Sequence, residues 1–248
     1  MEKGNISLTD KINKYLPKIE QLWSKKVTIH HLLTHTHGIR STKEPLEFEL
    51  GSKFKYSQLG YNLLARILEQ VTDKSFENLA TELFNKYKLS NTFHPNNKTY
   101  KNLVNGYKEN KNGEMIFATN SLRNYAAAGS FISNAKDLST WNELLHSGKL
   151  VTTETLELMK TKYATRRHPI FGKVEYGYGL LFKDGEENIQ IGALGYAPGF
   201  VSASYYYPKT KLNLIVLENT ARDLDDFKKV FRIHIEIMKI IKNELPTR

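Results

Sequence analysis

Two Ser-x-x-Lys tetrads stand out as candidates for chemistry, Ser52-Lys53-Phe54-Lys55 and Ser133-Asn134-Ala135-Lys136. On a helix, this spacing places a lysine amine one turn from a serine hydroxyl, where the amine can help to deprotonate a nucleophile. The first tetrad lies in an aromatic-rich turn, where helical geometry is not expected. The second begins an ordinary surface helix, for which Ser133 is well placed as a cap. Each tetrad is therefore a weak candidate for a nucleophile.

A third candidate is the segment Tyr56-Ser57-Gln58, which lies where an amphipathic helix begins. A tyrosine has a pKa of ~10, so Tyr56 can act as a base only if a nearby cation lowers that value. Taken alone, the segment indicates a packing aromatic ring.

A group of histidines lies on and just after a short predicted helix. Two of them are one helical turn apart, as metal ligands often are, but no Asp or Glu lies between Val27 and Thr42 to complete a site. The pattern favours packing or surface histidines, and we expect neither a metal nor a cofactor. The group consists of His30, His31, His35 and His37.

Composition excludes several classes of protein. The 248 residues contain no cysteine, which excludes a disulfide scaffold, a thiolate zinc site and a cysteine nucleophile. The 36 basic and 26 acidic residues give a net charge of +10, but the basic residues are scattered, so we expect no nucleic-acid partner. No apolar run reaches the ~18 residues of a membrane span. The N-terminus shows no signal peptide, so the chain is cytoplasmic as written, and the compartment stays open because a chain without cysteine suits either redox environment.

Hydrophobic periodicity predicts an α+β fold in one domain, residues 1–248. Residues from about 1 to 150 are expected to be mainly helical, and residues from about 170 to 248 to form an antiparallel sheet covered by a C-terminal helix. Helices are expected at 27–34, 59–71, 75–87 and 134–146, a hairpin turn at Asn112-Gly113, strands at 176–182, 200–207 and 212–217, and a final helix after Asn219.

Five blocks follow one another along the chain: Gly4–Asp10 with Lys14–Pro17, Thr28–Ile39, Gly51–Tyr61, Ala127–Ser133 and Pro198–Phe200. Together they resemble the serine β-lactamase and penicillin-binding-protein-like superfamily. The resemblance is to its branch of class C β-lactamases, D-alanyl-D-alanine peptidases and esterases, and it extends over essentially the whole chain. The second block is similar to the family's "TIRHLLTHTSGI" nearly residue for residue.

The resemblance implies acyl-transfer machinery in three parts: Ser-x-x-Lys, Tyr-x-Asn and Lys/His-Thr/Ser-Gly. Tyr56 matches the tyrosine as a remnant general base, and Gln58 stands where asparagine is usual. The third part maps onto the substrate-binding triplet Ala193-Leu194-Gly195, which keeps the glycine and loses the cation and the hydroxyl. The backbone N–H of Tyr196 is implied as an oxyanion donor.

In the family, the Ser-x-x-Lys helix lies just upstream of the block that Met1–Leu8 matches. The resemblance therefore implies that the nucleophile and the first two sheet strands are missing from this chain. Family members are often exported. The missing strands also imply an unpaired sheet edge at residues 200–207 and its neighbours, and hence self-association.

We therefore expect a β-lactamase-related serine hydrolase domain in truncated or degenerate form, weakly active or inactive as given. Its substrates are expected to be amides or esters, such as β-lactams, D-Ala peptides or small esters. The alternative is a non-catalytic module that binds a cell-wall peptide or a protein partner in the remnant cleft.

Overall fold

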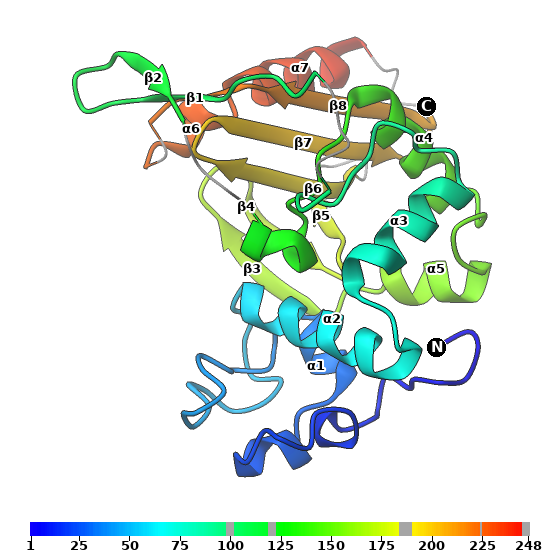
Figure 1. Cartoon of the computed structure of the whole chain (residues 1–248). Coiled ribbons are helices and arrows are strands. Elements are labelled where there is room, and N and C mark those ends of the chain that lie inside the picture. The colour runs from blue at the N-terminus through cyan, green and yellow to red at the C-terminus, as the bar shows by residue number, and fades with distance from the viewer. Residues whose placement is uncertain (98–101, 119–122, 184–189, 224, 245–248) are drawn as a thin grey trace.

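The chain folds into an α+β structure, as expected, with a six-stranded antiparallel sheet beside a group of helices (Figure 1). This computed structural model describes residues 1–97, 102–118, 123–183, 190–223 and 225–244. Within those ranges, no helix combines the length and the apolar character needed to cross a bilayer.

The helices of the first part begin where capping side chains satisfy the free N–H groups of the first turn. Thr28, Ser57 and Ser75 cap the first three helices, and each predicted range was correct to within two residues. The cap of the fourth helix is Asn134 rather than Ser133, whose hydroxyl instead pairs with the Thr92 hydroxyl at 2.9 Å. The helices are α1 (Ile29–Leu33), α2 (Gln58–Thr72), α3 (Phe76–Lys86), α4 (Ala135–His146), α5 (Thr153–Lys160), α6 (Phe227–Val230) and α7 (Arg232–Glu244), with short 3₁₀ turns at Ile12–Lys14, Leu22–Lys25 and Arg123–Ala128.

The main sheet runs in the order β3-β4-β5-β6-β7-β8, and every neighbouring pair is antiparallel. On one face, Ile237, Met238 and Ile241 of α7 pack against the strands, so the expected C-terminal helix does cover the sheet. On α4, Asn142 donates to the Ser204 hydroxyl of β7 at 3.2 Å. The strands are β3 (Ala164–His168), β4 (Gly172–Tyr176), β5 (Leu181–Lys183), β6 (Gln190–Ala197), β7 (Phe200–Tyr207) and β8 (Leu212–Glu218).

A smaller sheet joins the two parts of the chain. The predicted hairpin is present, with β1 (Tyr107–Glu109) antiparallel to β2 (Met115–Phe117). β1 also pairs in parallel with β9 (Thr220–Ala221), which follows the last strand of the main sheet. The mainly helical part therefore contributes strands that pair with the C-terminal part.

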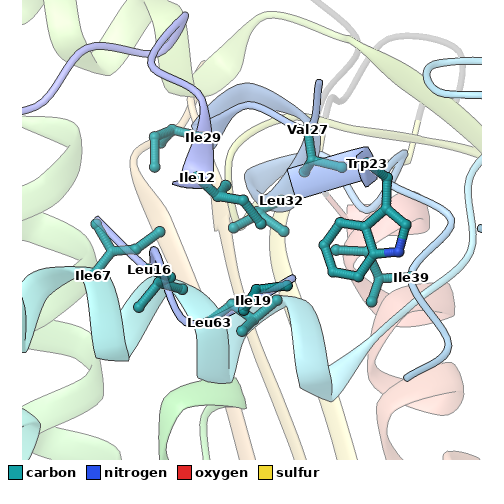
Figure 2. Close-up of a cluster of buried hydrophobic side chains, with 10 residues drawn as sticks. All are labelled: Ile12, Leu16, Ile19, Trp23, Val27, Ile29, Leu32, Ile39, Leu63 and Ile67. Atoms are coloured by element: carbon teal, nitrogen blue, oxygen red, sulfur yellow. The ribbon is translucent and has the colours of Figure 1, made fainter. Parts of the chain in front are cut away.

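The helical part has its own hydrophobic core, in which the first 39 residues pack on α2 (Figure 2). The Ile12 N–H donates to the Val27 carbonyl at 3.0 Å, and the Trp23 indole N–H donates to the Glu44 carbonyl at 2.8 Å. These bonds tie the N-terminal turns to the segments that flank α1, and Leu63 and Ile67 supply the apolar contact with α2. The core residues are Ile12, Leu16, Ile19, Trp23, Val27, Ile29, Leu32, Ile39, Leu63 and Ile67.

The unpaired edge lies at β8, a neighbour of the predicted strand 200–207, and not at that strand itself. The strand β7, at the predicted residues 200–207, has β6 on one side and β8 on the other, so its ladder is complete. Among the described strands, the sheet ends at β8 and at β3. The seven-residue strand β8 is the longer of the two, and it carries the exposed Leu217.

Self-association through the β8 edge remains a prediction. An unpaired strand edge offers its free N–H and C=O groups to another chain, and an added charge on such an edge opposes pairing. We therefore expect Leu217→Lys to lower the average mass in light scattering at high protein concentration, whereas Leu22→Lys, at an exposed site far along the chain from the sheet, leaves it unchanged. A wild-type protein that is monomeric at every concentration would contradict this prediction.

Candidate active-site cleft

The candidate site is built around His35, which follows α1 and is almost completely buried. Its Nδ1 atom accepts a hydrogen bond from the Ser57 N–H at 3.2 Å, and its backbone carbonyl accepts one from the Lys55 N–H at 2.9 Å. His35 therefore holds the backbone on both sides of Tyr56, in the segment immediately before α2.

The His35 ring also touches four aromatic rings. It stacks on Tyr61 of α2 with ring centroids 4.8 Å apart, and its centroid lies 4.7 Å from that of Tyr56 and 5.4 Å from that of Phe54. The fourth ring, Tyr176 of β4, lies 5.2 Å away. Burial lowers the pKa of His35 to about 3, so the imidazole is neutral and Nδ1 is free to accept a hydrogen bond.

The other three histidines of the predicted group also have structural contacts. His31 accepts the Thr28 N–H on its Nδ1 and completes a capping box for α1. The His30 Nδ1 is 2.7 Å from the Tyr178 hydroxyl, and the His37 Nδ1 accepts the Ile39 N–H at 2.9 Å. In the described part of the chain, no three His, Asp or Glu side chains are grouped so that they could hold a metal ion.

His37 also explains a glycine within α2. A Cβ atom at Gly60 would lie 2.5 Å from the His37 Nε2 atom, which is closer than packed atoms approach. The glycine therefore lets the segment after α1 lie flush against the first turn of α2. This close packing places Tyr56 and Gln58 at the surface of the helical part.

Tyr56 is half-exposed and lines a cleft between the helical part and the β3 strand. Burial raises the pKa of its hydroxyl, and the positive charge of Arg166 offsets part of that rise. The phenol is therefore protonated at neutral pH. Gln58, the first residue of α2, is exposed, and its side chain makes no hydrogen bond within the described residues, so its amide is available to a ligand.

Neither Ser-x-x-Lys tetrad has the geometry of a nucleophile and its base. Ser52 lies in a turn and donates to the Glu49 carbonyl at 2.7 Å, while Lys55 pairs with Glu47 at 2.5 Å. In the second tetrad, Ser133 pairs with the hydroxyl of Thr92 and lies before the helical residues of α4.

The triplet Ala193-Leu194-Gly195 lies in the middle of β6, paired with residues 202–204 of β7. In the described ladder, β5 pairs only with residues 190–192 of β6, so the triplet lies beyond the end of β5. Leu194 packs into the hydrophobic layers under α6 and α7. A Cβ atom at Gly195 would lie 2.6 Å from the Ser202 hydroxyl, which explains the glycine.

Tyr196 follows this triplet, and its side chain packs edge-on against Phe227 of α6 with ring centroids 5.1 Å apart. A negative charge on Tyr196 would raise the pKa of Tyr56, so the two hydroxyls are within electrostatic reach. Neither Tyr196 nor the triplet Ala193-Leu194-Gly195 is among the residues that line the cleft beside Tyr56.

A family model described as Beta-lactamase matches residues 1–237. The chain belongs to the beta-lactamase family. Among curated relatives, this family member is 25% identical over 213 residues to the teichoic acid D-alanine hydrolase of Staphylococcus aureus, an alignment that covers 78% of this chain and 52% of that protein. The chain thus spans about half the length of the curated relatives it matches.

Solved structures share the fold at low sequence identity. The D-amino acid amidase of Ochrobactrum anthropi SV3 superposes with a TM-score of 0.84 at 21% identity, covering 99% of this chain and 79% of that one. The penicillin-binding protein of Bacillus halodurans superposes with a TM-score of 0.77 at 20% identity, covering 96% and 80%. This beta-lactamase-family chain therefore has the penicillin-binding-protein-like fold.

Sequence reasoning missed two residues that shape the cleft, Arg166 and Tyr176. Both lie on the β3–β4 hairpin, whose first strand, Ala164–His168, has no alternation of apolar and polar residues. In the sequence, only the adjacent pair Arg166 and Arg167 pointed to this segment. The position of the pair next to Tyr56 depends on long-range packing.

The hydrogen bond from Ser57 to His35 makes a testable contribution to stability. His35→Phe keeps an aromatic ring in the pocket but leaves the Ser57 N–H without its acceptor, which costs about 1–3 kcal/mol of unfolding free energy. Urea denaturation should show this loss. His146→Phe is the matched control, because the His146 ring stacks on Tyr206 at 4.1 Å and no hydrogen bond involves it in the described residues. Equal stability of His35→Phe and the control would contradict the assigned role.

Stability should fall as the pH drops below about 6.5. Burial lowers the pKa of His35 to about 3 and that of His37 to about 4, so the unfolded chain takes up protons at a higher pH than the folded chain does. Each such histidine contributes a slope of up to about 1.4 kcal/mol per pH unit between its folded and unfolded pKa values. Urea midpoints at about pH 7.5, 6 and 5 test this. A midpoint that stays constant or rises toward pH 5 would contradict it.

Proposed function

We propose that this chain carries part of a β-lactamase-related acyl-transfer site for D-aminoacyl amides or esters, with little or no acyl-enzyme activity of its own. The observation that supports this most directly is the position of Tyr56 and Gln58. Tyr56 lies at the edge of the cleft just before α2, and Gln58 is the exposed first residue of that helix. The serines of the two Ser-x-x-Lys tetrads are both engaged elsewhere, Ser52 with the Glu49 carbonyl and Ser133 with the Thr92 hydroxyl.

The substrate class is proposed from the relatives. One relative is a teichoic acid D-alanine hydrolase and a structural neighbour is a D-amino acid amidase. The first name describes hydrolysis that involves the D-alanine of teichoic acid, and the second describes hydrolysis of an amide of a D-amino acid. β-Lactams, D-Ala peptides and small esters are the corresponding probes.

Low activity is proposed from the chemistry of the described residues. Removing the nucleophile of a catalytic unit of this kind costs about six decades in kcat, and it leaves about 10³–10⁴-fold catalysis over water. Burial keeps the Tyr56 phenol protonated, so it is a poor base in the present arrangement. The residual capacity of the site is to bind and orient a ligand.

Hydrolysis assays test this proposal. With nitrocefin and a D-alanyl p-nitrophenyl ester, we expect no burst and a rate no higher than weak background catalysis, and Tyr56→Phe should not change it. Tyr107→Phe, which alters a phenol in the β1–β2 hairpin, is the control for nonspecific effects. A burst of product that Tyr56→Phe abolishes and Tyr107→Phe retains would overturn the assignment of low activity.

The alternative is a non-catalytic module that binds a cell-wall peptide or a protein partner. What favours it is that β6 keeps Gly195 and the Pro198-Gly199 turn into β7, while Ala193 replaces the expected cation. Saturable binding of a D-Ala-D-Ala peptide without turnover, measured by calorimetry, would support the module. Absence of binding to any cell-wall fragment or protein would count against it.

A further inference from the structure

The basic residues are scattered along the sequence, but the fold gathers five of them around one cleft. The cleft has a volume of about 760 Å³ and lies between the segment 51–56 and the segment 162–167. No carboxylate is among its lining residues. We call it the basic cleft, and its cations are Lys53, Lys55, Lys162, Arg166 and Arg167.

Two of these cations are already neutralised by acidic residues. Lys55 pairs with Glu47 at 2.5 Å, and Lys162 pairs with Glu175 at 2.6 Å. Within the described ranges, Lys53, Arg166 and Arg167 have no carboxylate within ion-pair distance. These three residues give the basic cleft its net positive charge.

Arg166 is the most constrained of the three. It is half-buried, and its guanidinium lies over the Phe54 ring at 5.7 Å from the centroid, within electrostatic reach of Tyr56, Tyr176 and Tyr196. An arginine keeps its charge even when burial lowers its pKa. A guanidinium that packs a face on a ring still presents N–H groups at its edge, in the fork geometry that binds two oxygens of a phosphate.

Lys53 and Arg167 extend this charge along the cleft from two different segments. The Lys53 ammonium lies 4.8 Å from the centroid of the Phe48 ring, and Arg167 is exposed on β3 next to Arg166. The three cations therefore border the cleft from both sides. Such an arrangement suits a chain of anions better than a single small anion.

We propose that the basic cleft binds the phosphodiester backbone of a flexible polyol-phosphate polymer, with Arg166 on one phosphate and Lys53 and Arg167 on neighbouring ones. The inference rests on the proposed function in one respect, because it takes the polymer to be the molecule that carries the D-aminoacyl group to the site beside Tyr56. It concerns the polymer to which the D-aminoacyl group is attached, and not the acyl group itself.

The aromatic residues of the basic cleft favour a polymer without bases. Proteins that hold single-stranded nucleic acid offer aromatic rings on which successive bases stack. Here Phe54 packs against Arg166 and His35, Tyr163 stacks on Tyr178 at 4.5 Å, and Tyr56 packs on His35. A polyol-phosphate backbone requires only the cations.

Fluorescence anisotropy with a labelled glycerol-phosphate oligomer that carries no D-alanine tests the proposal. Three phosphate contacts predict a slope of about −2 for the logarithm of affinity against the logarithm of salt, or roughly 15-fold weaker binding at about 200 mM than at about 50 mM salt. Because the probe has no acyl group, binding is read independently of any hydrolysis. A failure of the proposed acyl-transfer function would therefore leave this result unchanged.

Variants assign the binding to the basic cleft. We expect Arg166→Gln to weaken binding roughly five- to tenfold and to reduce the salt slope by about 0.7, since one phosphate contact is lost. Arg166→Lys keeps the charge but loses the fork, and it should restore part of the affinity. The triple variant Lys53→Gln/Arg166→Gln/Arg167→Gln should abolish binding. The control triple Lys18→Gln/Lys25→Gln/Lys209→Gln removes the same charge from exposed sites outside the cleft and should retain it.

Three results would overturn the proposal. Equal losses in the two triple variants would mean that only the net charge matters. Equal affinity for poly-glutamate would exclude recognition of phosphate. Tighter binding of an oligothymidylate, lost in the Arg166 triple variant, would identify the basic cleft as a nucleic-acid site instead.

Discussion

The hydrogen bond from the Ser57 N–H to a neutral His35 is the interaction on which the cleft depends. It requires an unprotonated Nδ1, and burial among aromatic rings provides that state by lowering the pKa of the imidazole to about 3. The same ring contacts Tyr61 on α2 and Tyr176 on β4. One side chain therefore orders the start of α2 and joins the helical part to the sheet.

The chemistry of the cleft follows from this arrangement. Because His35 fixes the backbone on both sides of Tyr56, the phenol stands at the edge of the cleft and faces the β3 strand that carries Arg166. Arg166 lowers the pKa of Tyr56, but burial outweighs it, so the cleft holds a protonated phenol beside a fixed cation. Such a pair is better suited to binding an anionic ligand than to removing a proton.

Much of the fold could be predicted from the sequence, because the relevant signals are local. Helix caps and the helical spacing of apolar residues predicted α2, α3 and α4, and a two-residue period in a β-rich segment predicted β7. The β3–β4 hairpin and α5 were missed, since the hairpin is polar and α5 buries only Leu156. The sequence did not distinguish the paired strand β7 from its edge neighbour β8, because strand order is set by long-range pairing.

Only the part of the candidate site that depends on local sequence could be predicted. Tyr56 and Gln58 were singled out from a local block of sequence, and Tyr56 lines the cleft while Gln58 is the exposed first residue of α2. The positions of Arg166 and Tyr176 follow from contacts between segments more than one hundred residues apart, such as the pairing of the Tyr61 and Tyr176 hydroxyls at 3.5 Å. No local pattern in the sequence records these contacts.

The protonation state of His35 tests this account most directly. Two-bond ¹H–¹⁵N correlation spectra of the imidazole groups distinguish the two ring nitrogens and follow their titration. The account predicts that His35 carries its proton on Nε2 and stays neutral from about pH 7 to about pH 5, well above its pKa of about 3. A His35 that carries its proton on Nδ1, or that titrates with an ordinary pKa of about 6.5, would contradict it.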